Sequence, residues 1–295
     1  MVFLIPGCTG GRAVSEPPVH LQAGRQDATR GAELYQKGCY SRALEFFLIA
    51  HRKFSASDQL AGVAMCLNNI GTTYRALGHA ETAALFFHEA HTLYRRLDDR
   101  AAAAQALCNR AAALIDMGRM DEAEAALDAA GSQLPAGRLP AYLLKTRGVL
   151  MMKKGVYAEA EALLQAALDR TKPENAAALG ATRSAMGALM QQTGRPEAAV
   201  RFYRAALEAD RTAGFYKGIA DDLVALSGLA ETMDETVALL KRSIQIYALM
   251  DDRERVAEIM GRLEAAAEKG AVDIDLTRHF VKTWLDDPSG WTPCR

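Results

Sequence analysis

The chain has 295 residues with 35 basic and 36 acidic side chains, so its formal net charge is −1. A protein that binds nucleic acid or another polyanion needs an excess of Lys and Arg, and this balance argues against that class. Half of the residues are apolar but only 7% are aromatic, and alanine runs such as Ala101–Ala104 recur without strand-like alternation. The sequence therefore predicts an all-α fold, with no apolar run long enough to span a membrane.

The N-terminal segment opens with the uncharged apolar stretch Val2–Ile5, followed by Gly7 and Cys8. The stretch Ile5–Cys8 resembles a bacterial lipobox, whose cysteine is acylated after the preceding signal is removed. The resemblance implies lipidation of Cys8 and a membrane-anchored lipoprotein in the bacterial cell envelope. The alternative is a cytoplasmic protein. Residues 1–24 are expected to be a signal remnant and flexible tether, because the residues after Cys8 are rich in Gly, Pro and polar side chains.

The other four cysteines are Cys39, Cys66, Cys108 and Cys294, and none has the spacing of a zinc site or a CxxC motif. The first three fall within segments expected to be helical. We expect them to be small buried side chains rather than disulfide partners.

Small side chains recur along the chain at intervals of 40, 40, 37 and 39 residues. The series is Ala43, Ala83, Ala123, Ala160 and Ala199, with a second alanine seven residues after each member. A large apolar residue lies between the two alanines of each unit: Phe47, Phe87, Leu127, Leu164 and Tyr203. Five residues before each first alanine is a glycine: Gly38, Gly78, Gly118, Gly155 and Gly194.

This pattern predicts repeated helix–turn–helix hairpins. Small residues let two helices approach closely, and the large side chain fills the space that remains. The glycine can adopt the left-handed conformation that ends one helix and starts the turn. Because one hairpin cannot bury its own apolar face, the hairpins are expected to stack into an α-solenoid.

The pattern resembles the tetratricopeptide repeat family, in a lengthened form similar to the repeats of kinesin light chain. Residues 67–90 match the family's pattern in phase, from Leu67 and Gly71 in a first helix to Phe87 and Ala90 in a second. The resemblance implies a right-handed superhelix over residues 25–270, with five clear repeats, a degraded sixth that includes Gly228, and a capping helix at about Arg253–Lys269. A plain helical bundle is the alternative.

First helices line the concave side of such a stack, and their polar residues are the candidate binding site. The resemblance implies that asparagines in an LNN sequence hydrogen-bond an extended peptide, since an amide offers a donor and an acceptor as a peptide bond does. A structural bond to a neighbouring helix is the alternative for Asn69 and Asn109. The predicted peptide-binding groove comprises Asn68, Asn69, Thr72, Arg75, Gln105, Asn109, Tyr142 and Lys145.

No catalytic, metal-binding or cofactor motif is found. His88 and His91 lack the spacing of HExxH, and no phosphate-binding or nucleophile-elbow sequence occurs. We therefore expect a protein that is not an enzyme and binds no cofactor, metal, nucleic acid or small-molecule substrate.

The C-terminal segment 271–295 differs from the repeats and contains both tryptophans, Trp284 and Trp291. Leu276–Leu285 is expected to form one short amphipathic helix, which either covers the last helix of the stack or docks to a partner, including a second copy of the chain. The sequence thus predicts a non-catalytic protein-interaction scaffold for a peptide segment or protein subunit. A role in an envelope assembly or export system is favoured, and a cytoplasmic regulator that recognises a signalling peptide or sensor protein is the alternative.

Overall fold

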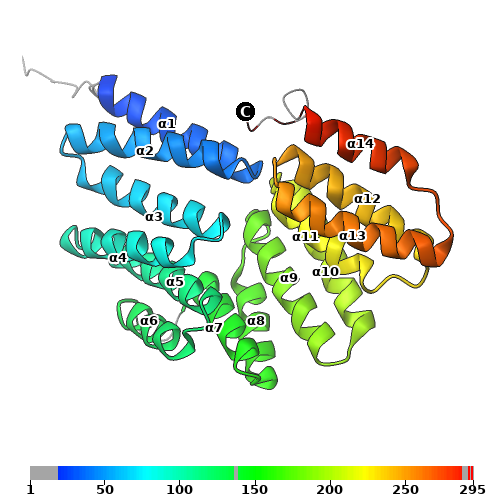
Figure 1. Cartoon of the computed structure of the whole chain (residues 1–295). Helices are drawn as coiled ribbons and strands as arrows, with labels where there is room; N and C mark the ends of the chain where they lie inside the picture. Colours follow the sequence, from blue (N-terminus) through cyan, green and yellow to red (C-terminus); the bar gives the residue numbers. More distant parts are fainter. Residues whose placement is uncertain (1–18, 136–138, 288–291, 293, 295) are drawn as a thin grey trace, which may run out of the picture.

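The computed structural model describes residues 19–135, 139–287, 292 and 294, and Cys8 and Trp291 lie outside these residues. The described residues form fourteen α-helices and no strand, so the predicted all-α solenoid is confirmed. Successive helices pair as antiparallel hairpins that stack into an arc (Figure 1). The helices are α1 (Val19–Gln36), α2 (Tyr40–Ala56), α3 (Leu60–Ala76), α4 (Ala80–Arg96), α5 (Arg100–Asp116), α6 (Met120–Ser132), α7 (Ala141–Lys153), α8 (Tyr157–Arg170), α9 (Ala176–Gln192), α10 (Pro196–Ala213), α11 (Tyr216–Ser227), α12 (Met233–Leu249), α13 (Arg253–Gly270) and α14 (Asp275–Asp286).

Helix α1 begins inside the stretch that the sequence assigned to a flexible tether. It starts at Val19, so residues 19–24 are helical rather than extended linker. The reason is that no proline follows Pro18 in this region, and the residues after it are compatible with helix. Among the described residues, no helix combines the length and apolar character that crossing a bilayer requires.

Each of the first five hairpins turns at its predicted glycine. The φ angles of Gly38, Gly78, Gly118, Gly155 and Gly194 lie between 71° and 84°. In the second hairpin the residue after the glycine, His79, donates its backbone N–H to the Tyr74 carbonyl at 2.9 Å. This bond satisfies a carbonyl at the end of α3 that the helix itself leaves unpaired.

The large residue of each second helix packs on a residue of the preceding helix that has little or no side chain. A Cβ added to Gly148 would lie 2.8 Å from Leu164 Cγ, and one added to Gly71 would lie 2.9 Å from the Phe87 ring. The alanines that flank the large residue in α8 are fully buried. The repeated small residues therefore set how closely the two helices of a hairpin approach.

The sixth hairpin departs from this pattern. Its first helix, α11, ends at Ser227, so Gly228 lies at the helix end with a φ of −76° and not within the helix. A Cβ on Gly228 would meet no side chain within 4 Å. Gly228 therefore does not pack against a large residue of α12, as its sequence position suggested. The reason is that α11 is short and ends before the position where α12 approaches it.

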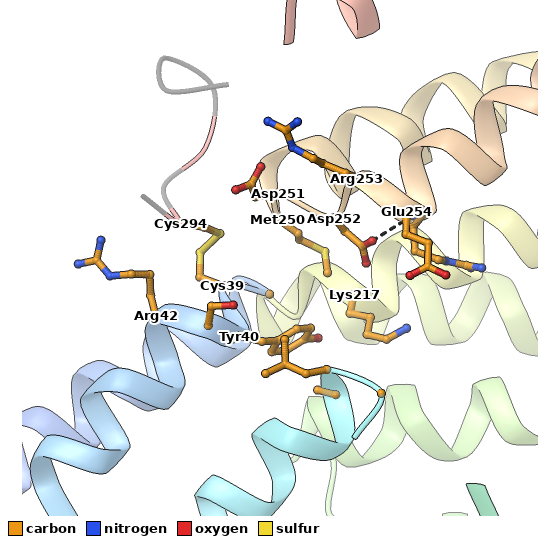
Figure 2. Close-up of a pocket in the computed structure, with 16 residues that line it drawn as sticks. Cys39, Tyr40, Arg42, Lys217, Met250, Asp251, Asp252, Arg253, Glu254 and Cys294 are labelled. Carbon is orange, nitrogen blue, oxygen red and sulfur yellow. Dashed lines mark hydrogen bonds between the residues drawn. A yellow bond between two sulfur atoms is a disulfide. The ribbon is translucent and has the colours of Figure 1, made fainter. Parts of the chain in front are cut away.

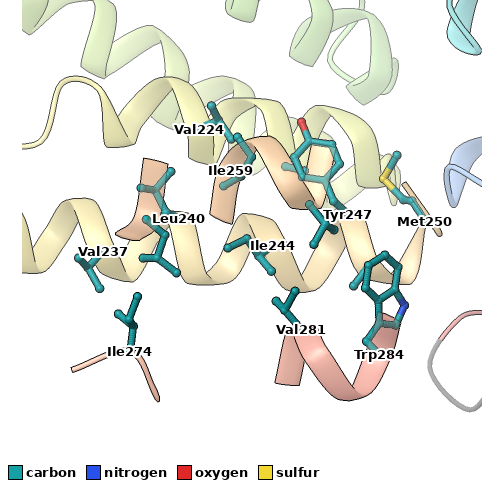
Figure 3. Packing of buried hydrophobic residues seen from close by; sticks show 14 of the residues in the cluster. Val224, Val237, Leu240, Ile244, Tyr247, Met250, Ile259, Ile274, Val281 and Trp284 are labelled. Atoms are coloured by element: carbon teal, nitrogen blue, oxygen red, sulfur yellow. The ribbon is translucent and has the colours of Figure 1, made fainter. Parts of the chain in front are cut away.

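Helices α13 and α14 complete the C-terminal end of the stack. Trp284 of α14 is fully buried against α12, next to Tyr247 and Met250, while Val281 lies one turn earlier on the same face (Figure 3). The segment thus folds back onto the last hairpin as a cap. Leu276 on the opposite face of α14 stays 82% exposed.

The arc closes on itself, because the turn between α1 and α2 reaches the turn between α12 and α13 (Figure 1). Tyr40 belongs to the same buried cluster as Tyr247, and a Cβ on Gly38 would overlap Met250.

The closure also brings two cysteines together. Cys39 forms a disulfide with Cys294, 255 residues away in the sequence. The expectation that Cys39 is not a disulfide partner is therefore wrong, because it lies at the turn where the two ends of the arc meet. Cys66 and Cys108 are buried free thiols, as expected.

We predict that Gly148→Ala lowers the free energy of unfolding by about 1–3 kcal/mol, because the added methyl group must displace Leu164 in a closely packed hairpin. Urea denaturation monitored by circular dichroism measures the change. Gly261→Ala in α13 is the control, since its Cβ would meet nothing within 4 Å. It should be neutral or raise stability by about 0.5–1 kcal/mol. Equal effects of the two substitutions would contradict the packing argument.

Candidate functional site

A cavity of about 410 Å³ lies on the inner wall of the arc, where the first two hairpins face the fifth and sixth. Tyr35 of α1 and Phe215, just before α11, stack across this junction with ring centroids 6.4 Å apart. The lining also takes in Phe47, Asn69, Thr72 and several alanines. The cavity is thus built by two segments that are far apart in the sequence, residues 32–72 and 177–215.

Three of the predicted groove residues bond one another, once between α5 and α3 and once within α5. Asn109 of α5 donates from Nδ2 to the Asn68 Oδ1 of α3 at 2.9 Å, and Gln105 donates from Nε2 to the Asn109 Oδ1 at 3.1 Å. All three side chains are half-buried. Asn109 therefore has a structural bond, as the alternative interpretation held, and its partner is Asn68 of the predicted groove.

Asn69 differs from this pair because its side chain lines the cavity. Its backbone carbonyl accepts a hydrogen bond from the Thr73 hydroxyl at 2.8 Å, whereas its side-chain amide bonds no other residue in the part of the chain that the structure describes. Thr72 also lines the cavity, with its hydroxyl donated to the Asn68 carbonyl at 2.9 Å. Asn69 thus carries a half-buried amide that is available to a ligand.

Arg75, Tyr142 and Lys145 extend the inner surface over α3 and α7. Arg75 pairs with Asp116 at 2.6 Å, and both side chains are about two-fifths exposed, so this pair adds little to stability. Burial lowers the pKa of the Lys145 ammonium, and the charge of Arg75 acts in the same direction. Burial also raises the pKa of the Tyr142 phenol to about 12. No described residue forms an ion pair with Lys145.

Two buried acids of the fifth and sixth hairpins were not identified from the sequence. Asp210 of α10 and Asp222 of α11 are 2% and 1% exposed. The Ser184 hydroxyl donates to Asp222 Oδ1, while Asp210 Oδ1 and Asp222 Oδ2 have no hydrogen-bond partner among the described residues. Burial raises the pKa of Asp210 to about 7 and that of Asp222 to about 8, and the nearby Asp221 carboxylate adds to both shifts.

Glycines make room for one of these acids. A Cβ on Gly180 of α9 or on Gly218 of α11 would fall 2.0 Å from a carboxyl oxygen of Asp210. The Asp210 carboxyl therefore lies closely packed between α9 and α11. The two glycines are 38 residues apart, within the repeat interval, and Asp210 follows Tyr203 by seven residues as Phe54 follows Phe47. The sequence analysis missed the site because it followed only the alanines and turn glycines of the repeat.

A second cavity of about 470 Å³ lies on the other side of the closure, beside the Cys39–Cys294 disulfide (Figure 2). Charged side chains of both signs border it, among them Arg42, Lys217 and Glu254. Among the described residues, no group of three or more His, Cys, Asp and Glu side chains is arranged to hold a metal ion.

Comparison with known families places tetratricopeptide repeats at residues 63–97, 104–130 and 140–212. No curated protein matches the sequence. Several solved structures share the fold. The Rap conjugation gene regulator of plasmid pLS20, solved in complex with the Phr* peptide, is 18% identical with a TM-score of 0.64, covering 97% of this chain and 82% of its own.

Two further structures resemble the chain at a lower level. The apo quorum sensor NprR from B. thuringiensis has a TM-score of 0.52 at 15% identity, over 84% of this chain and 77% of its own. A thermophilic tetratricopeptide repeat protein from Thermus thermophilus has a TM-score of 0.51 at 24% identity, over 69% and 99%. The chain therefore contains tetratricopeptide repeats at residues 63–97, 104–130 and 140–212. This fold supports a protein-interaction scaffold.

The buried acids predict a pH dependence of stability. Their folded pKa values, about 7 and about 8, lie above the ordinary value of 3.8, so the folded state binds protons that the unfolded state releases. Stability is therefore fully present below about pH 4 and is lost as pH rises through the folded values. We expect the free energy of unfolding to fall by roughly 2 kcal/mol or more between pH 5 and pH 8.

The double variant Asp210→Asn/Asp222→Asn should remove most of this fall, because the amides stay neutral. Thermal denaturation from pH 5 to pH 9 measures it, with the exposed acid variant Asp169→Asn on α8 as control. A wild-type profile that is flat over this range would show that the two carboxyls have ordinary pKa values in the folded protein.

Proposed function

We propose that the chain is a non-catalytic scaffold that holds an extended peptide, or an extended segment of a protein subunit, along the inner wall of the arc. The observation that carries the proposal is the contrast between two adjacent asparagines. Asn68 is bonded by Asn109, whereas the Asn69 amide faces the cavity and bonds no described side chain. An amide that has no partner in the protein can donate to and accept from the backbone of a bound peptide.

The other inner residues fit the same role. Tyr142 and Lys145 lie along a neighbouring first helix, α7, and Lys145 is a half-buried cation without an ion-pair partner among the described residues. The Rap regulator, whose structure covers 97% of this chain, was solved with a peptide bound, and this favours a peptide as the occupant. A second copy of the chain remains an alternative partner.

The test selects peptides from a displayed random library with the full chain as bait and measures their Kd by fluorescence anisotropy. We expect Asn69→Ala to weaken binding about tenfold, the cost of one or two lost hydrogen bonds to buried partners. Its melting temperature should stay close to that of wild type, because the amide has no partner to lose. The control is Gln165→Ala, an exposed amide on α8 that should leave binding unchanged.

Asn109→Ala, by contrast, should lower the stability of the protein. It removes two hydrogen bonds within the protein and should lower the free energy of unfolding by about 1–2 kcal/mol. Failure to select any peptide, or an Asn69→Ala affinity equal to that of wild type, would count against the scaffold proposal.

We further propose that this scaffold is a lipoprotein of the bacterial cell envelope, tethered through Cys8. Besides the lipobox resemblance, support comes from the Cys39–Cys294 disulfide. Disulfides that join distant parts of a chain persist in oxidising compartments outside the cytoplasm. A membrane-tethered scaffold of this kind suits a role in an assembly or export system.

Counting free thiols tests the location. Cells are quenched in acid, the protein is denatured, and a heavy maleimide reagent labels each unmodified thiol of the five cysteines. An acylated Cys8 and an intact disulfide leave two thiols, Cys66 and Cys108. We therefore expect two labels in wild type and the same two in Cys8→Ser, because an acylated cysteine contributes none. Incorporation of palmitate into wild type but not into Cys8→Ser confirms the lipid directly.

The second candidate is a cytoplasmic regulator that responds to a signalling peptide. The observation that favours it is the match with the Rap regulator and with the quorum sensor NprR. Labelling of all five cysteines, with no palmitate, would support this candidate instead, because the cytoplasm keeps thiols reduced.

A further inference from the structure

The inner cavity is a junction site, because one wall comes from the first two hairpins and the other from the fifth and sixth. Tyr35 and Phe47 belong to the first hairpin, and Asn69 to the second. Ala181 of α9 faces them together with Phe215. Neither wall alone encloses the space, so the cavity exists only while the arc is closed.

The lining of the cavity defines what it can hold. Aromatic rings and alanine methyl groups make up most of it, and no charged side chain lines it among the described residues. The polar groups of Asn69 and Thr72 lie together on α3. An uncharged apolar group is favoured in such a space, while an adjacent amide satisfies the peptide bond beside it. A volume of about 410 Å³ is within the range of pockets that bury a ligand group.

We propose that this cavity is the anchor site of the groove and takes one large apolar side chain of a bound peptide. The proposal rests on the proposed function and makes it specific. The Asn69 amide holds the peptide backbone, and the cavity between Tyr35, Phe47 and Phe215 selects a residue such as Leu, Ile, Met or Phe. Burying such a side chain accounts for a large share of the affinity.

The Cys39–Cys294 disulfide supports the same anchor site. It joins the α1–α2 turn to the C-terminal segment, and Thr292 of that segment donates its hydroxyl to the Leu249 carbonyl at the end of α12 at 2.6 Å. Tyr35 is four residues before Cys39 in the sequence and so lies close to this covalent link. The disulfide thus fixes the two cavity walls relative to each other in the free protein. This reduces the conformational entropy that the protein loses on binding the peptide.

The test uses the full chain and a peptide selected as above, with a second peptide in which the large apolar residue is replaced by Ala. Ala181→Trp places a ring in the cavity from an exposed inner position. The matched control is Ala158→Trp, which adds the same ring at an exposed position on the outer helix α8. Circular dichroism and melting temperature verify that both variants fold as wild type does.

We expect the selected peptides to share a large apolar residue, and its replacement by Ala to weaken binding to wild type about tenfold. Ala181→Trp should bind both peptides with the same reduced affinity, because the cavity is already filled. Ala158→Trp should match wild type.

Two results would overturn the anchor site: a tenfold difference between the peptides that persists in Ala181→Trp, or selected peptides without a large apolar residue. If Asn69→Ala still weakens binding in those cases, the groove proposal stands and only the anchor is lost. If Asn69→Ala also has no effect, both proposals fail.

The double variant Cys39→Ser/Cys294→Ser tests the disulfide. It should bind the selected peptide about fivefold or more weakly than the oxidised wild type, while circular dichroism shows the same helix content. Treating wild type with a reductant should give the same loss, and treating the double variant should change nothing further. Equal affinities of the oxidised wild type and the double variant would overturn the role of the disulfide in binding.

Discussion

The structure depends on one repeated contact, in which a large side chain of a second helix packs on a first-helix residue that is glycine or alanine. Phe87 on Gly71 and Leu164 on Gly148 are examples, with almost no space for a methyl group between them. This contact fixes the distance between the helices of each hairpin, and the fully buried alanines on either side fix the distance to the next. Because close packing tolerates few changes in volume, the same geometry recurs and the hairpins accumulate into an arc.

An arc of this kind can leave its two ends apart, and here they meet. Tyr40 enters the buried cluster of α12 and α13, Tyr35 stacks with Phe215, and Cys39 is bonded to Cys294. Closure turns one stretch of the inner wall into a cavity. It also places an apolar lining next to an unpaired amide, so the features that suit a peptide occur together at the junction.

Some polar side chains of the inner wall have a hydrogen-bond partner within the protein, and others have none. We assign a structural role to the first kind and a binding role to the second. Asn109 and Asn68 form a bond that ties α5 to α3, whereas Asn69 has no such partner among the described residues. In the fifth and sixth hairpins, Asp210 and Asp222 are buried with oxygens that bond no described residue, and raised pKa values keep their protons near neutral pH at some cost to stability. Unsatisfied buried polar groups of this kind are uncommon in folded proteins, and each one calls for an explanation beyond folding.

The sequence alone determined the hairpins, their turns and their stacking, because these depend on residues within one repeat. Gly38 and the alanine series act locally, and their spacing is visible without coordinates. It also placed the polar residues of the groove on the first helices, but not which of them bond one another. Only the tertiary structure decided that Asn109 bonds Asn68 and that Cys39 meets Cys294. Small changes of angle add up over successive hairpins, so where the two ends of the arc come to lie depends on the whole array and on no single repeat.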